Sequence, residues 1–198
     1  MIQLTGSIEA DLKTVVYDAI SDLLQNTPLS QLISDSAMLS RLSGQSIRVF
    51  KSSVLEPADM PALSIAGLPE EPMEAFVGQH VEEEGTDEDG EWPAYWGQRF
   101  RAQVSIEAVA LNSQLRDDMY RLCKVLAMAV AYRIIRDEDG VFSNPTVMPG
   151  GEGAAEFAQD PTIIFHAGVR ISAQYLLALK DVADTVGTVH VGTMTPIT

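Results

Sequence analysis

The fold of this chain is decided by the stretch from Gln98 to Asp139, which reads QRFRAQVSIEAVALNSQLRDDMYRLCKVLAMAVAYRIIRDED. In its first part apolar and polar side chains alternate. The apolar positions are Phe100, Ala102, Val104, Ile106, Ala108 and Ala110. Since successive side chains of a strand point to opposite faces, this part predicts a long strand with one apolar and one polar face.

The period of the apolar residues changes after this strand. They recur every three or four positions, which is typical of a helix with one buried stripe: Leu115, Met119, Leu122, Leu126, Ala129 and Val130. Asn112 or Ser113 can cap this helix by accepting hydrogen bonds from amides of its first turn. Asp117 and Asp118 favour the positive end of the helix dipole, and Gly140 is expected to stop the helix. A strand that leads directly into a long helix predicts a sheet covered by that helix.

A second alternating stretch follows further along the chain. Its apolar positions are Ile163, Phe165, Ala167, Val169, Ile171, Ala173, Tyr175 and Leu177. This pattern predicts a second long strand, which we expect to pair with the first. His166 and Arg170 fall on its polar face.

Shorter elements precede these. Helical spacing predicts a helix from Ser7 to Gln25, with Gly6 or Ser7 as its cap. Pro28 suits the first turn of a second helix, and strands are expected at 47–55 and 62–66. The predicted fold class is α/β (α+β), with a mixed or antiparallel sheet of about four to five strands, N-terminal helices and one long helix packed on one face.

The chain of 198 residues is predicted to form a single α/β domain over residues 1–183, with an extended C-terminal arm at 184–198. Two loops interrupt the domain, at 68–93 and 143–161, since both segments are rich in proline and glycine and have no sustained apolar period. The first loop is expected to be partly a hairpin around the region from Gly78 to Val81. It also contains an acidic run: Glu82, Glu83, Glu84, Asp87, Glu88, Asp89 and Glu91.

Composition excludes several classes of function. The 28 acidic and 13 basic residues give a net charge of −15, and a surface of this charge repels phosphate and anionic lipid. No apolar run reaches the roughly 18 residues that span a bilayer, and the N-terminus lacks the basic region of a secretory signal. Cys123 is the single cysteine, so no internal disulfide is expected, and its position within the long helix indicates packing.

No catalytic, cofactor-binding or metal-binding motif is found. The acidic runs that end at Gly90 and Gly140 do not place oxygen ligands at the spacing of a calcium loop. The three histidines lack companions at zinc-ligand spacing. The glycines of residues 150–153 neither follow a predicted strand nor open a helix, and Glu152 would repel phosphate, so we interpret them as a flexible loop.

The candidate functional residues therefore belong to an interaction surface. Basic side chains on one sheet face of an acidic protein suit docking to an acidic neighbour, or they pair with acids of the same sheet face. Aromatic residues beside the acidic run could anchor a protein contact or pack the base of the loop onto the core. The interface candidates are Arg99, Arg101, Glu107, Arg170, Trp92 and Trp96.

The order of elements resembles that of the tail-terminator proteins of long-tailed bacteriophages and their minor-tail and neck relatives. The resemblance is carried by the helix over Ile8–Leu24, the strand entry Met60–Ile65, the strand and helix over Arg99–Arg136, and the strand over Ile163–Leu177. The segment 68–93 and the residues after Asp184 lie outside it.

The resemblance implies a structural virion protein without enzymatic activity. It implies a ring, a hexamer, that is assembled in the host cytoplasm, caps the tail tube and meets the head-side connector protein. DNA would pass through the lumen without specific binding, and neither a cofactor nor a membrane is involved. Six copies would together carry −90, so the contacts between subunits must overcome considerable repulsion.

Three other readings stay open. The chain could occupy another position in the neck, or be a minor tail protein. It could instead be an acidic binding module that mimics DNA, although its densest acidic cluster lies in a glycine-containing segment. Lastly, opposing strands could bring distant residues together into an enzyme site: Arg99, Arg101, Glu107, His166 and Arg170.

Overall fold

The computed structural model describes residues 2–5, 11–52, 57–73, 79–81, 95–137, 141–157 and 160–181. Their strands form one mixed sheet of seven strands. Five of them follow one another across the sheet in the order β1 (Ile2–Thr5), β7 (Asp160–Asp181), β5 (Tyr95–Ala110), β3 (Ala62–Pro72) and β2 (Arg48–Phe50). In addition, β4 (Gln79–Val81) pairs with β5, and β6 (Ser143–Phe157) pairs with β7. The pairing of β2 with β3 is parallel and the others are antiparallel.

The two long strands form the centre of the sheet, as the sequence predicts. Pairing between β5 and β7 is regular from Tyr95 opposite Lys180 to Ala110 opposite Phe165. Val104 lies opposite Ile171, and both side chains are buried. The apolar halves of the two alternating patterns therefore share one face of the sheet.

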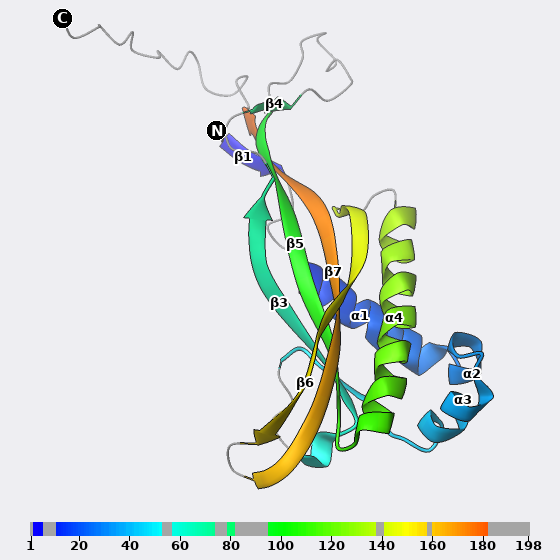
Figure 1. Ribbon diagram of the computed structural model, residues 1–198. Helices are drawn as coiled ribbons and strands as arrows, with labels where there is room; N and C mark the ends of the chain where they lie inside the picture. The colour runs from blue at the N-terminus through cyan, green and yellow to red at the C-terminus, as the bar shows by residue number, and fades with distance from the viewer. Residues whose placement is uncertain are drawn as a thin grey trace, which may run out of the picture.

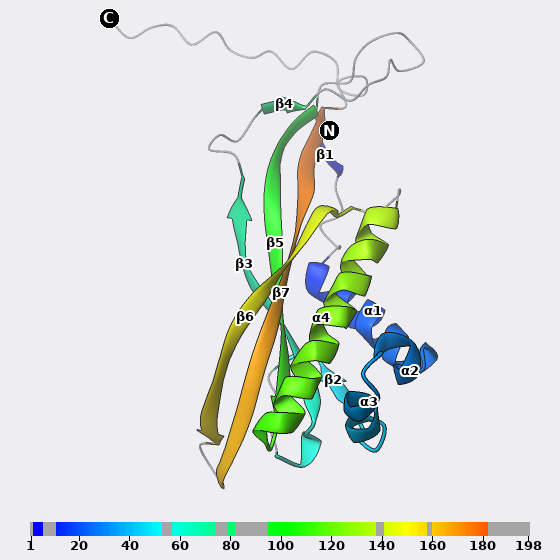
Figure 2. The same ribbon diagram turned by 45° about the vertical axis from the view of Figure 1, so that its right-hand side comes forward.

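All four α-helices of the described residues lie on that apolar face (Figures 1 and 2). They are α1 (Leu12–Asn26), α2 (Leu29–Leu32), α3 (Ser36–Leu42) and α4 (Ser113–Arg136), and a short 3-10 turn covers Pro57–Asp59. The core between the layers contains Ile20 of α1, Ile65 of β3, Ile106 of β5 and Leu126 of α4. The predicted class, α+β with a long helix packed on one face of the sheet, is confirmed.

Helices α1, α3 and α4 begin at side chains that accept from free amides of the first turn, whereas α2 begins at Pro28 without such a cap. Asn112 caps α4, with its side-chain oxygen 2.8 Å from the amide nitrogen of Leu115, as predicted. The start of α1 differs from the prediction: its cap is Asp11, whose carboxylate accepts from the amide of Lys13 at 2.9 Å. Helical spacing alone extended this helix too far toward the N-terminus, and Gly6 and Ser7 lie outside the described residues.

The prediction of a loop over residues 143–161 is wrong, because most of this segment is the strand β6. Within the described residues β6 pairs with β7 alone, so its outer edge needs no ladder amides and tolerates proline, which has none. A Cβ at Gly150 would lie 2.8 Å from the carbonyl carbon of Gly168, so glycine permits the two strands to approach. Proline and glycine here are features of an edge strand rather than of a flexible loop.

The predicted excursion over 68–93 is shorter than expected at its start, because β3 continues to Pro72. The expected hairpin near Val81 is present as β4, with Val81 opposite Tyr95 of β5. The acidic run 82–91 and the arm 184–198 lie outside the described residues. Among the helices that are described, none combines the length and apolar character needed to span a membrane.

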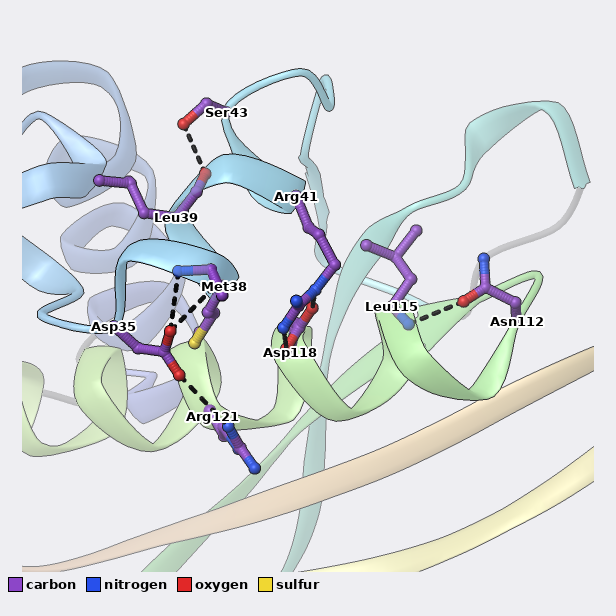
Figure 3. A network of polar contacts seen from close by, with 10 residues as sticks. Asp35, Met38, Leu39, Arg41, Ser43, Asn112, Leu115, Asp118 and Arg121 are labelled. Atoms are coloured by element: carbon purple, nitrogen blue, oxygen red, sulfur yellow. Dashed lines mark hydrogen bonds and ion pairs between the residues drawn. The ribbon is translucent and has the colours of Figure 1, made fainter.

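An ion pair joins α3, one of the N-terminal helices, to the long helix α4. Figure 3 shows Arg41 of α3 reaching Asp118 of α4, with Nη2 of the arginine 2.9 Å from Oδ1 of the aspartate. Asp118 was expected only to favour the dipole of α4, but its side chain is fully buried. Its position shows that α3 covers the first turns of α4.

Candidate functional site

The candidate interface residues of the two long strands lie together on the helix-free face of the sheet. Arg99, Arg101 and Glu107 alternate along β5 with buried residues that face the helices, and therefore point away from them. Arg170 lies directly opposite Ser105, which belongs to the same outward set. The sheet thus brings three cations and one carboxylate of distant segments onto one surface, which we call the polar sheet face.

One of these cations has an acidic neighbour. Nη1 of Arg101 lies 3.9 Å from Oε2 of Glu71, which lies opposite it on β3. Both side chains are largely exposed, and exposed pairs of this kind contribute little to stability. The pair partly neutralises the charge of Arg101 at one end of the face.

Glu107 and Arg170 approach one another in the middle of the sheet. Glu107 lies opposite Gly168, and a Cβ on that glycine would lie 3.3 Å from Cγ of Glu107. The side chain of Glu107 therefore passes over the glycine, toward the strand that carries Arg170. Diagonal neighbours across two strands are about 7–8 Å apart at their backbones, and no ion pair joins these two residues in the part of the chain that is described. Arg170 is exposed and, within the described residues, has no acidic partner, so it can meet a group of another molecule.

Between these charges the polar sheet face carries uncharged polar side chains, most of them small. Gln103, Ser105 and Ser172 lie on it, and the hydroxyl oxygens of Thr146 and Ser172 are 2.7 Å apart across β6 and β7. None of the four charged candidates lines the pocket of about 580 Å³ at the end of α4. The exposed apolar Met148 lies on the same face, opposite Arg170. A surface with scattered cations that do not line this pocket suits contact with a broad partner better than capture of a small molecule.

The alternative of an enzyme site requires the four charged candidates and His166 to lie close together. His166 lies opposite Val109, and Arg99 lies ten residues before Val109 on the same strand. At about 3.3 Å per residue these positions are roughly 33 Å apart. Within the described residues no group of three or more histidine, cysteine or acidic side chains could hold a metal ion. Arg99 and His166 therefore do not meet in one centre, whereas His166 and Arg170 each lie two residues from Gly168, which is opposite Glu107.

The two tryptophan candidates are described only in part. Trp92 lies outside the described residues. The backbone of Trp96 lies on β5, opposite His80 of β4 and Leu179 of β7. Of these two candidates, therefore, only Trp96 is placed on the sheet, at the end of β5 that pairs with β4.

Sequence reasoning missed a second exposed surface, on the side of α4 that faces away from the sheet. Four large apolar side chains of this helix are exposed: Val125, Met128, Tyr132 and Ile135. We call them the α4 stripe. Their spacing of three, four and three residues was visible in the sequence. It was obscured because the buried stripe of the same helix has a similar period, and hydrophobicity alone does not say which stripe meets the sheet.

Comparisons with known proteins give little further information. No protein-family model matches the chain, and no curated protein matches it. A chain from the "Virion of native gene transfer agent (GTA) particle" is similar in structure, with 13% identical residues and a TM-score of 0.31, over 89% of this chain and 100% of that chain. Such a low TM-score does not bear on the function of this chain.

Proposed function

We propose that this chain is a structural virion protein that acts by assembly, as a tail terminator of a long-tailed phage. In this role six copies form a ring that caps the tail tube and joins it to the head-side connector protein, and DNA passes through the ring. The observation that carries the proposal is the polar sheet face, where exposed arginines gather on a strongly acidic chain. Another position in the neck or tail is the nearest alternative.

The order of elements supports this role. The resemblance to tail terminators rests on an N-terminal helix, a proline-led strand, a long strand followed by a long helix, and a final long strand. In the structure α1, β3, β5, α4 and β7 follow one another in this order. The strands β1 and β6 are additions that the resemblance did not include.

The charge distribution also supports assembly. Each copy carries −15, so neighbouring copies repel one another at long range. Contact then requires cations placed where the copies meet. Arg99 and Arg170 are exposed on the polar sheet face, and neither is paired with a carboxylate in the described residues. They are therefore available to acidic groups of a neighbouring copy, of the tail tube or of the connector.

The proposal is tested by producing phage particles without this chain and imaging their tails. We expect tubes of uncontrolled length, or finished tails that fail to join heads, and restoration of normal particles by the wild-type chain. Arg170→Glu should restore poorly, since it reverses a charge on the polar sheet face. Lys13→Glu is the matched control, because it makes the same charge change in the first turn of α1, where an acid is favoured.

Normal tails of normal length, correctly joined to heads in the absence of this chain, would contradict the proposal. In that case the acidic binding module takes its place, and binding of the isolated chain to DNA-binding proteins becomes the relevant measurement. Equal restoration by Arg170→Glu and Lys13→Glu would show that the polar sheet face is not the contact surface.

A further inference from the structure

The α4 stripe is a continuous apolar surface that the described fold leaves exposed. The exposed fractions are 38% for Val125, 61% for Met128, 57% for Tyr132 and 64% for Ile135. The opposite side of the helix is buried against the sheet through Met119, Leu122, Leu126 and Val130. Helix α4 therefore has two apolar sides, of which the sheet covers one.

The spacing of the stripe is that of a helix-pairing seam. Steps of three, four and three residues correspond to successive a and d positions of two heptads, the positions through which one helix packs on another. The seam is about 15 Å long, at 1.5 Å per residue. Toward the N-terminus it ends at Arg121, whose guanidinium lies 3.8 Å from the carboxylate of Asp35. The surface therefore fits a partner helix of about three turns.

A pocket continues the seam at its C-terminal end. It has a volume of about 580 Å³ and is lined by Ile134, Ile135, Asp137, Phe142, Ser143, Asn144 and Pro145. Ile135 belongs to both the stripe and the pocket. The apolar part of this lining, at Ile134, Ile135 and Phe142, could take an apolar side chain of a partner helix, beside the polar side chains of the same pocket.

The charged residues beside the α4 stripe indicate which charge a partner should carry. Lys124 and Arg136 flank the seam at positions where pairing helices exchange charges. Lys124 lies over the ring of Tyr120, at 4.1 Å from its centroid, and Arg136 donates to the hydroxyl of Tyr132 at 3.0 Å. Neither is paired with a carboxylate among the residues that the structure describes. Both cations are therefore available to acidic groups of a partner.

The helix is also a basic element of an acidic chain. Residues Ser113–Arg136 contain five basic and two acidic residues, a net charge of +3, which leaves −18 for the rest of the chain. If two copies met in parallel through their stripes, Lys124 of one would face Ala129 of the other, and Arg136 would face Ala131. Neither cation would then gain an acidic partner. The charge pattern thus favours an acidic helix over a second copy.

We propose that the α4 stripe docks an amphipathic helix of a partner protein, with apolar residues at its a and d positions and acidic residues beside them. This surface lies on the opposite side of the chain from the polar sheet face, so variants of the two surfaces can be tested independently. The partner is recognised by apolar burial along the seam and by carboxylates that meet Lys124 and Arg136.

The probe is a fluorescent synthetic helix of three heptads, with leucine at a and d and glutamate at e and g. A peptide with lysine in place of each glutamate is its counterpart. We expect the acidic peptide to bind the full chain and to bind more weakly at high salt, and the basic peptide not to bind. Fluorescence anisotropy at several salt concentrations measures this.

Variants locate the contact. Met128→Asp and Ile135→Asp should each weaken binding by at least about tenfold. Ile163→Asp, at an exposed apolar residue of β7, is the matched control and should bind as wild type does. The double change Lys124→Glu and Arg136→Glu should reverse the preference toward the basic peptide. Arg170→Glu should leave binding unchanged, so a failure of the proposed ring contact is distinguishable from a failure of this surface.

Three results would overturn the proposal. The first is absence of binding by the acidic peptide, with circular dichroism showing a folded chain. The second is binding that Met128→Asp and Ile135→Asp leave intact. The third is self-association of the wild-type chain that Met128→Asp abolishes, measured by sedimentation, since this would identify a second copy as the occupant.

Discussion

Arg41 of α3 holds the buried carboxylate of Asp118 on α4 through two hydrogen bonds, from Nε and Nη2 of one guanidinium (Figure 3). The side chain of Asp118 is 0% exposed, whereas that of Arg41 is 42% exposed. The hydrogen bonds to Asp118 raise the pKa of Arg41 above its usual value. The carboxylate of Asp118 thus has no access to water, and the guanidinium of Arg41 supplies its hydrogen bonds.

This asymmetry gives the first prediction. Arg41→Ala should destabilise the fold more than Asp118→Asn, because it leaves a buried carboxylate uncompensated. Breaking a buried ion pair on one side typically costs about 3–5 kcal/mol. Urea denaturation of both variants measures the difference. Arg121→Ala, which breaks an exposed pair with Asp35, is the control and should change little. Equal losses for Arg41→Ala and Arg121→Ala would contradict this account.

The second prediction concerns the approach of β6 to β7. Gly150→Ala should destabilise the fold by about 1–3 kcal/mol, the usual cost of overpacking, because its Cβ would lie 2.8 Å from the backbone of Gly168. Gly151→Ala is a matched control one residue away, where an added Cβ meets nothing within 4 Å. Thermal melts compare the two variants. If both variants melt at the wild-type temperature, β6 and β7 have room for a Cβ at position 150, and this prediction is wrong.

The third prediction concerns the hydroxyl of Tyr175, which donates to Oε2 of Glu70 at 2.6 Å. Burial and this hydrogen bond raise the pKa of Tyr175 from 10.0 to about 12. Because the folded state holds this proton more tightly, the contribution to stability is complete below about pH 10 and is lost as the pH rises toward 12. We therefore expect wild type to lose stability over this range relative to Tyr175→Phe, which keeps the stacked contact with Phe100.

Urea denaturation at several pH values measures this loss. Tyr132→Phe, at an exposed tyrosine of α4, is the control and should follow the wild-type profile. A constant stability difference between wild type and Tyr175→Phe across the alkaline range would contradict the linkage.

The fourth prediction concerns Cys123, which is fully buried in the middle of α4. Burial raises the pKa of its thiol from 9.0 to about 12. Since the thiolate is the reactive species, the folded chain should resist thiol reagents near neutral pH and react promptly in denaturant. Gln114→Cys places a second thiol at an exposed position of the same helix and should react at once. Rapid reaction of Cys123 in the folded chain would show that α4 is not packed as described.

The sequence by itself determined the central unit of this protein. The alternation from Phe100 to Ala110 and the helical period from Leu115 to Val130 each depend on neighbours along the chain, so they predicted β5 and α4 without knowledge of distant contacts. The cap at Asn112 is likewise local. The alternation also predicted correctly that Arg99, Arg101, Glu107 and Arg170 would share the polar face of a sheet.

Tertiary structure alone decided the features that depend on contacts between distant segments. From the sequence alone, the glycines of β6 suggested a loop. In the structure Gly150 lies against the backbone of Gly168 on β7, where an added Cβ would not fit. The burial of Asp118 depends on Arg41, which is 77 residues away. The exposure of Met128 and Ile135 depends on which side of α4 the sheet covers. Periodicity gives each element its faces, but packing between elements decides which face meets the core and which is left for a partner.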